Sequence, residues 1–299
     1  SGYGFDKHAG HWVMKPFFKD HTSYGAVLAM LLPPAIALLS KRNRPTLTRV
    51  LLAIATIVIT LGLVFSFTRA AWVSLAGVAG IYAAMRFGFK LKTLVGLGVI
   101  MIALIWSSQD SIIIELQRNK QDSSDNLTEH IESISNVSSD DSNLERLNRW
   151  SCAISLFKAR PVTGWGPGTY QFVYAPFQKS DLKTIISTNN ADGGNAHSEY
   201  LGPLAEQGVP GALFMLLLIW WASIVGFRLW RKIENVDDRN LAVSVYLGLM
   251  TYFIHGVLNN YLDTDKASAP FWGFLALLVV LDLELKQKED SRLLKSATQ

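Results

Sequence analysis

A histidine close to two acidic residues is the first candidate for chemistry in this sequence of 299 residues. His197 lies in the segment Asn195-Ala-His-Ser-Glu-Tyr200, and Glu199 and Glu206 follow it closely. Because an imidazole titrates near neutral pH, His197 is suited to take a proton from a hydroxyl nucleophile. Glu199 or Glu206 would then orient the imidazole or raise its basicity. A structural histidine is the alternative interpretation of the same pattern.

Four arginines are candidates for binding an anionic group: Arg69, Arg146, Arg149 and Arg160. A guanidinium presents a planar fork of donors that suits phosphate oxygens. Arg69 follows a long apolar stretch, and its alternative role is an interfacial anchor. The other three lie on one helix-like segment, where a solvated or lipid-headgroup face is the alternative.

Two further residues need an interpretation. His255 lies near the end of an apolar stretch, where a histidine is a functional candidate, although a hydrogen bond between helices is equally plausible. Cys152 is the single cysteine, so it forms no intrachain disulfide, and we expect it to be a small packed residue. No cysteine ligand set, phosphate-binding glycine loop or nucleophilic-serine motif occurs in the sequence, and we expect neither a metal nor a cofactor.

The elements that position these residues are predicted to be membrane spans. Hydrophobic residues make up 49% of the chain and charged residues only 17%. This composition and several long stretches that are nearly free of charge exclude a soluble globular enzyme and predict an all-α, polytopic transmembrane protein. The seven candidate spans are Thr22–Ser40, Leu47–Phe67, Ala70–Met85, Thr93–Ser108, Val209–Trp230, Leu241–Tyr261 and Ala269–Leu285.

The basic residues predict the orientation of these spans. They cluster in four regions that fall on the same side when the spans alternate, and the positive-inside rule makes that side the cytoplasm. The formal charge of +4 therefore has a topological cause, and we expect no nucleic-acid partner. The basic residues of the four regions are Lys41, Arg42 and Arg44; Arg86, Lys90 and Lys92; Arg228, Arg231 and Lys232; and Lys286, Lys288, Arg292 and Lys295.

The chain is predicted to have three consecutive parts. Residues 1–108 comprise an external segment and four spans, residues 109–208 form a large external loop, and residues 209–299 comprise three spans and a cytoplasmic tail. In the loop, Gln121–Asn143 is acidic and rich in Ser and Asn, so we expect it to be mobile. An apolar-periodic helical segment then ends before Pro161, and the glycines up to Gly168 predict a fixed turn.

Taken together, these features resemble the O-antigen ligase and O-antigen polymerase superfamily of bacterial membrane glycosyltransferases. The stretches that carry the resemblance are Phe67-Thr-Arg-Ala-Ala-Trp72, Arg146-Leu-Asn-Arg-Trp150 with Pro161-Val-Thr-Gly-Trp-Gly-Pro-Gly168, Ala196-His-Ser-Glu-Tyr-Leu201 with Glu206-Gln-Gly-Val-Pro-Gly211, and His255-Gly through Trp272. Members usually have about twelve spans, so we expect roughly five to be missing before this sequence. Ser198 stands where asparagine is commonest, and the acidic insert is not a hallmark of the family.

The resemblance implies a metal-independent and inverting glycan transfer from undecaprenyl diphosphate to an acceptor hydroxyl of lipid A-core. It places the site at the periplasmic face of the bacterial inner membrane, among membrane lipids. His197 would be the general base, and Arg69 and Arg146 would bind the diphosphate. The supporting candidates are Arg149, Arg160, Glu199, Tyr200, Glu206 and His255.

Other functions remain open at this point. An O-antigen polymerase would use the same donor with another lipid-linked glycan as the acceptor, and a protein O-oligosaccharyltransferase would use a Ser or Thr of a protein. A transporter of lipid-linked glycans belongs to a different class and would place polar groups near the bilayer midplane. A membrane scaffold would leave the grouping of two arginines and a histidine unexplained.

Overall fold

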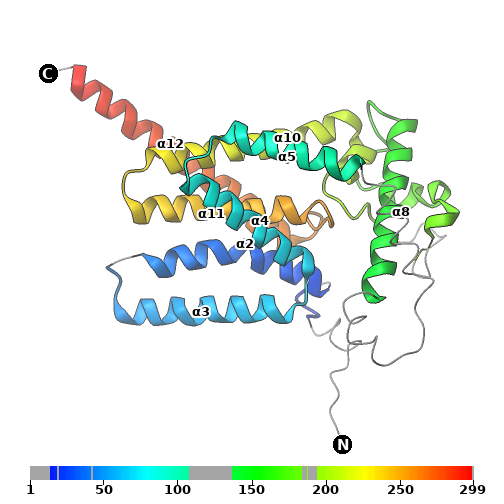
Figure 1. Cartoon of the computed structure of the whole chain (residues 1–299), viewed down its shortest axis with the longest axis horizontal. Helices are drawn as coiled ribbons and strands as arrows, with labels where there is room; N and C mark the ends of the chain where they lie inside the picture. The colour runs from blue at the N-terminus through cyan, green and yellow to red at the C-terminus, as the bar shows by residue number, and fades with distance from the viewer. Residues whose placement is uncertain are drawn as a thin grey trace, which may run out of the picture. The chain divides into compact units, whose positions relative to one another are not determined.

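The computed structural model describes residues 14–18, 20–41, 43–107, 137–183, 187 and 194–297. Within these ranges every regular element is an α-helix or a short 3-10 helix (Figure 1). The predicted all-α class is therefore confirmed. The long helices are α2 (His21–Ser40), α3 (Thr46–Phe65), α4 (Arg69–Arg86), α5 (Leu91–Ser107), α8 (Val137–Ala159), α10 (Leu201–Lys232), α11 (Val236–His255) and α12 (Asp265–Ala297).

Four of the described helices are long and apolar enough to cross a membrane: α2, α3, α10 and α12. Each of the seven predicted spans overlaps a helix, but Leu241–Tyr261 runs six residues past the end of α11 at His255. Helices α4, α5 and α11 are not both as long and as apolar as the other four. For α11 the reason is its position, because α2, α4 and α12 pack around it. A helix that faces other helices needs no apolar surface for lipid.

The exposed side chains of α3 show why these helices belong in lipid. Only 6% of the most apolar 18-residue stretch of α3 is buried. Leu51, Ile57 and Val58 are each more than half exposed. A soluble protein rarely leaves such a continuous apolar surface in water. The exposed aliphatic faces therefore confirm a helical membrane protein.

The described helices belong to two compact units, and the first unit combines helices from both ends of the sequence. It consists of Ser1–Leu91, Leu217–His255 and Tyr261–Gln299. Its centre is α11, which contacts α2 closely: a Cβ atom at Gly248 would lie 2.5 Å from the carbonyl oxygen of Met30. Small residues allow helix backbones in membranes to approach in this way.

The second unit consists of Lys92–Leu216 and Gly256–Asn260, and its core is built on α8. Cys152, Ala153 and Leu156 of α8 are fully buried against two tyrosines of the following segment, Tyr170 and Tyr174. The expectation that Cys152 is packed is thus confirmed. Three short helices follow α8: α9 (Tyr170–Val173), η1 (Ala175–Phe177) and η2 (Ser180–Leu182).

The segment predicted to be an external loop contains a helix and a turn where the sequence predicted them. Helix α8 ends at Ala159, just before Pro161, as expected for a residue that cannot continue a helix. The helix begins at Val137, so the last seven residues of the stretch predicted to be mobile are helical instead. Adding residues to an existing helix costs far less free energy than nucleating a new one, which explains why these polar residues are helical. Residues 121–136 of the same stretch lie outside the described residues.

Candidate functional site

His197 occupies a constrained backbone position four residues before α10. Its φ of 48° lies in the left-handed region, which residues other than glycine rarely adopt. The N–H of His197 donates to Oδ1 of Asn195 at 3.1 Å, and its carbonyl accepts from Nε1 of Trp150 at 3.3 Å. These two contacts hold the backbone from both sides. Such uncommon conformations are concentrated at functional sites.

Ser198 caps the turn that leads from this histidine into α10. Its Oγ accepts from the backbone N–H groups of Tyr200 at 3.3 Å and Leu201 at 3.4 Å, and its carbonyl accepts from the N–H of Gly202 at 3.0 Å. Serine is a favoured helix cap because its hydroxyl satisfies N–H groups that lack a partner inside the helix. Serine at this position therefore fixes where the helix begins relative to His197.

Arg146 and the segment around His197 hold the same short stretch of chain. Nε of Arg146 donates to the carbonyl of Leu258 at 3.2 Å, and the N–H of Glu199 donates to the carbonyl of Gly256 at 2.8 Å. Trp150, one helical turn after Arg146, is the residue that bonds the backbone of His197. The second unit thus brings Arg146 and His197 together around residues 256–258.

Glu199 and Tyr200 complete this cluster. Glu199 is buried, with 8% of its surface exposed, and Tyr200 is half-buried. Burial, assisted by the adjacent charge of Glu199, raises the pKa of the Tyr200 phenol above its ordinary value. Tyr200 therefore stays protonated at neutral pH and can donate a hydrogen bond, but it is not suited to act as a base.

Arg149 lies in the interior of the second unit. Its Nε donates to Oε1 of Glu145 at 2.6 Å, and its guanidinium lies 4.0 Å from the centre of the Tyr174 ring. Burial alone would lower the pKa of Arg149, but the hydrogen bond and the charge of Glu145 outweigh this effect and raise it. With 5% of its surface exposed, Arg149 stabilises the fold and does not present its charge to a ligand.

Glu206 holds the glycine turn against α10. Its Oε2 accepts from the N–H of Gly168 and its Oε1 from the N–H of Tyr170, both at 2.9 Å. Its backbone carbonyl also accepts from the N–H of Gly166 at 2.7 Å. Both carboxylate oxygens are therefore engaged with the turn, so Glu206 acts as a structural clamp.

Two glycines allow this turn and α10 to approach each other. Gly208 has a φ of 66°, which interrupts the helical geometry of α10, and a Cβ atom there would lie 2.5 Å from the carbonyl oxygen of Pro161. Gly164 has a φ of 63°, and its Cβ atom would lie 2.3 Å from the backbone of Glu206. Only glycine fits both positions. The two glycine-containing motifs of the sequence are thus the two sides of one contact.

The remaining candidates have other surroundings. Arg160 is exposed, and its guanidinium stacks 4.1 Å from the centre of the Trp165 ring. In the first unit, Arg69 is the exposed first residue of α4, which leaves both the phosphate-binding and the anchoring interpretations possible. His255 ends α11 and is 1% exposed, with its ring 5.9 Å from that of Tyr261. This position favours the role of contact between helices.

Sequence reasoning missed two residues that shape the site. Glu145 stands four positions before Arg149, and that spacing of opposite charges on a predicted helix indicates an ion pair. Asn195 stands two positions before His197, and asparagine often bonds the backbone two residues further on. Both signals were present in the sequence.

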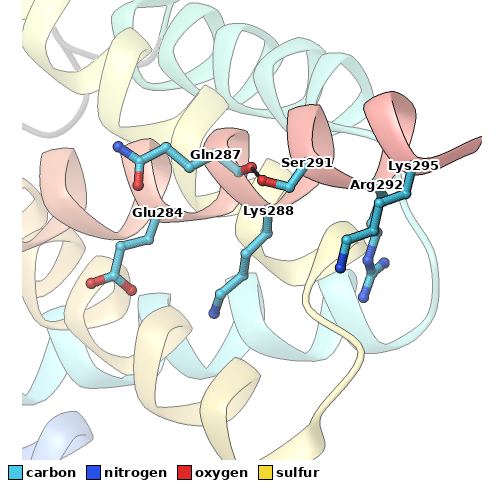
Figure 2. Close-up of a pocket in the computed structure, with 6 residues that line it drawn as sticks. All are labelled: Glu284, Gln287, Lys288, Ser291, Arg292 and Lys295. Atoms are coloured by element: carbon cyan, nitrogen blue, oxygen red, sulfur yellow. Dashed lines mark hydrogen bonds between the residues drawn. The ribbon is translucent and has the colours of Figure 1, made fainter. Parts of the chain in front are cut away.

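Two cavities lie near the end of α12. A groove of about 440 Å³ runs along the end of α12, where Glu284, Lys288, Arg292 and Lys295 project on one side of the helix (Figure 2). A neighbouring cavity contains the ion pairs Arg292–Glu234 and Lys232–Glu289, so its charges largely compensate one another. These cavities contain none of the candidate residues. Among the described residues, no group of three or more His, Cys, Asp or Glu side chains could hold a metal ion.

These observations define a helical membrane protein in which a histidine, an arginine and their supporting backbone converge on one segment between spans. The family described as O-antigen ligase matches residues 54–216, which is more than half of the chain. The chain belongs to this family. No curated protein matches the chain. Membership supports, in general terms, the transfer chemistry of O-antigen ligases and polymerases on lipid-linked glycans.

The matched region includes Arg69, Arg146 and His197, together with the glycine turn and Glu206. His255 lies outside it.

Proposed function

We propose that this chain transfers O-antigen or a related polysaccharide from undecaprenyl diphosphate to a hydroxyl group of lipid A-core. The reaction takes place at the periplasmic face of the bacterial inner membrane. The observation that carries the proposal is the constrained backbone of His197, which is bonded by the same helix that supplies Arg146. Membership in the O-antigen ligase family supports the class of donor.

The chemistry is a single displacement at the anomeric carbon of the donor sugar. His197 removes the proton of the acceptor hydroxyl as its oxygen forms the new glycosidic bond. The bond from the anomeric carbon to the diphosphate oxygen breaks, and the electron pair leaves with the carrier diphosphate. One displacement inverts the configuration of the anomeric carbon.

The leaving group carries negative charge that must be stabilised as the bond breaks. Arg69 and Arg146 supply this charge stabilisation with their forked guanidinium donors. Arg69 stands at the first position of α4, where the positive end of the helix dipole adds to its charge. Guanidinium groups can stabilise this charge without a metal, so the proposed mechanism uses no cofactor.

The other candidates have supporting parts in this proposal. Arg149 and Glu206 hold the loop in shape through the ion pair with Glu145 and the bonds to the glycine turn. Tyr200 stays neutral and would donate a hydrogen bond to the substrate. The acceptor distinguishes this reaction from those of a polymerase and a protein O-oligosaccharyltransferase, which share the donor.

The test is a lipopolysaccharide gel from the source bacterium after deletion of the gene and its restoration as wild type or His197→Ala. Deletion is expected to leave bare lipid A-core while long glycan accumulates on the undecaprenyl carrier. The wild-type gene should restore the ladder and His197→Ala should not, with equal protein in the membrane. A full ladder from His197→Ala would contradict the general-base role.

The arginines are tested in the same strain. Arg69→Ala and Arg146→Ala are expected to reduce the ladder strongly, and lysine at either position should rescue it only in part, because the fork is lost. The matched controls are Arg86→Ala, at the opposite end of α4, and Lys158→Ala, an exposed residue of α8. Both controls should keep the ladder.

The pattern in the deletion strain also separates the alternative functions. Core capped with a single repeat unit would identify a polymerase. An unchanged ladder with loss of a glycoprotein would identify a protein O-oligosaccharyltransferase. Donor trapped on the cytoplasmic side would identify a transporter.

A further inference from the structure

The start of α2 is bonded to the turn that precedes Arg69. Nδ1 of His21 donates to the carbonyl of Ser66 at 2.7 Å. The carbonyl of His21 accepts from Oγ1 of Thr68 at 3.1 Å. One residue of α2 thus holds both ends of a turn that lies 45 positions further along the chain.

This turn is packed tightly as well as hydrogen-bonded. Ser66 and Thr68 are 1% and 2% exposed, and Phe67 between them has a φ of 49°. A Cβ atom at Gly25, one turn after His21, would lie 2.5 Å from Oγ1 of Thr68. Left-handed backbone at a phenylalanine is unfavourable, so it persists only where its surroundings enforce it. Here the surroundings are the first turn of α2.

The turn determines the position of the first residue of α4, which is Arg69. The carbonyl of Thr68 accepts from the N–H groups of Ala71 and Trp72, at 3.1 and 3.3 Å, and thereby starts α4. The Thr68 hydroxyl does not cap the helix, because it donates to the carbonyls of His21 and Ser66. Any shift of the turn therefore moves the end of α4 that carries Arg69.

We propose that His21 is a positioning residue for donor binding, which acts by fixing the Ser66–Thr68 turn and so the placement of Arg69. This inference rests on the proposed role of Arg69 as a diphosphate-binding residue. His21 and Gly25 lie before the region that matches the family, so the family match does not assign them a role.

The experiment measures the dissociation constant of undecaprenyl diphosphate for the purified chain in detergent micelles. This probe carries the diphosphate and the lipid but no sugar, so it does not depend on the identity of the glycan. His21→Ala is expected to weaken binding about tenfold, the loss typical of one hydrogen bond that fixes a charged group. His21→Asn should restore most of the affinity, because its amide N–H can occupy the position of Nδ1–H.

A double-mutant cycle shows whether His21 acts through Arg69. In the Arg69→Ala background, His21→Ala should cause no further loss of affinity, because the group that it positions is absent. An independent loss in that background would overturn the inference and make His21 a general structural residue. Full affinity of His21→Ala in the wild-type background would overturn it as well.

A second variant avoids dependence on the stability of His21→Ala. Gly25→Ala pushes directly on Thr68 and should weaken binding in the same way, again only when Arg69 is present. Gly80→Ala is the matched control, because no atom within 4 Å would meet its Cβ. If Arg69→Ala alone leaves affinity unchanged, the proposed role of Arg69 fails, and this outcome differs from every failure of His21.

Discussion

Replacing Glu206 by alanine removes both oxygens that hold the glycine turn on α10. The N–H of Tyr170 belongs to a buried residue, and leaving it without a partner costs about 2 kcal/mol. The N–H of Gly168 is exposed and can turn to water, so its loss costs about 1 kcal/mol. The free energy of local unfolding at this turn should therefore fall by about 3 kcal/mol in Glu206→Ala. Glu206→Gln keeps one acceptor oxygen, so the fall should be about half as large.

The assay is amide hydrogen exchange of the purified protein, followed by mass spectrometry of peptides that cover Gly164–Tyr174. A local loss of about 3 kcal/mol corresponds to roughly 100-fold faster exchange in this turn. Gln207→Ala is the matched control, because Gln207 is the exposed neighbour of Glu206 on the same helix. Unchanged protection in Glu206→Ala would refute the clamp and return Glu206 to the residues that could orient His197.

Three further predictions concern the second unit. Gly208→Ala should lower the melting temperature by several degrees, because its Cβ would lie 2.5 Å from the carbonyl oxygen of Pro161. Gly202→Ala is the control, because its Cβ would make only ordinary contacts. Equal melting temperatures of the two variants would contradict the close approach at Gly208. Burial raises the pKa of the Cys152 thiol to about 11, so alkylation at pH 8 should be very slow until the protein unfolds, and rapid labelling of native protein would be inconsistent with this packing. Arg149→Ala leaves a buried carboxylate uncompensated and should destabilise the fold by about 3–5 kcal/mol, as denaturation of the purified protein would measure; a loss under 1 kcal/mol would argue against a buried pair.

Several boundaries of the fold could be predicted because each depends on local chemistry. Proline cannot continue a helix, and α8 ends just before Pro161. The predicted span Val209–Trp230 begins immediately after Gly208, where the geometry of α10 is interrupted. The central position of α11 could not be predicted, because the sequence does not show which helices pack around it.

The candidate site could be predicted only in part. His197 and Arg146 were identified from residue type and motif, and the structure brings them together around residues 256–258. Arg149 has the same side chain as Arg146 and stands three positions later, yet it is buried against Glu145. Three positions on a helix differ by only about 60° in direction. The two arginines nevertheless have different partners, Glu145 and the carbonyl of Leu258, and these partners are known only after folding.

The sequence by itself determined that this chain is a helical membrane protein and which residue types are available for transfer of a lipid-linked glycan. It could do so because the bilayer selects long apolar stretches by composition, a property that each stretch carries alone. Tertiary structure alone decided that Glu206 clamps the glycine turn and that His21 holds the turn before Arg69. These roles depend on contacts between residues 36 to 47 positions apart, and such contacts exist only when the whole chain has folded.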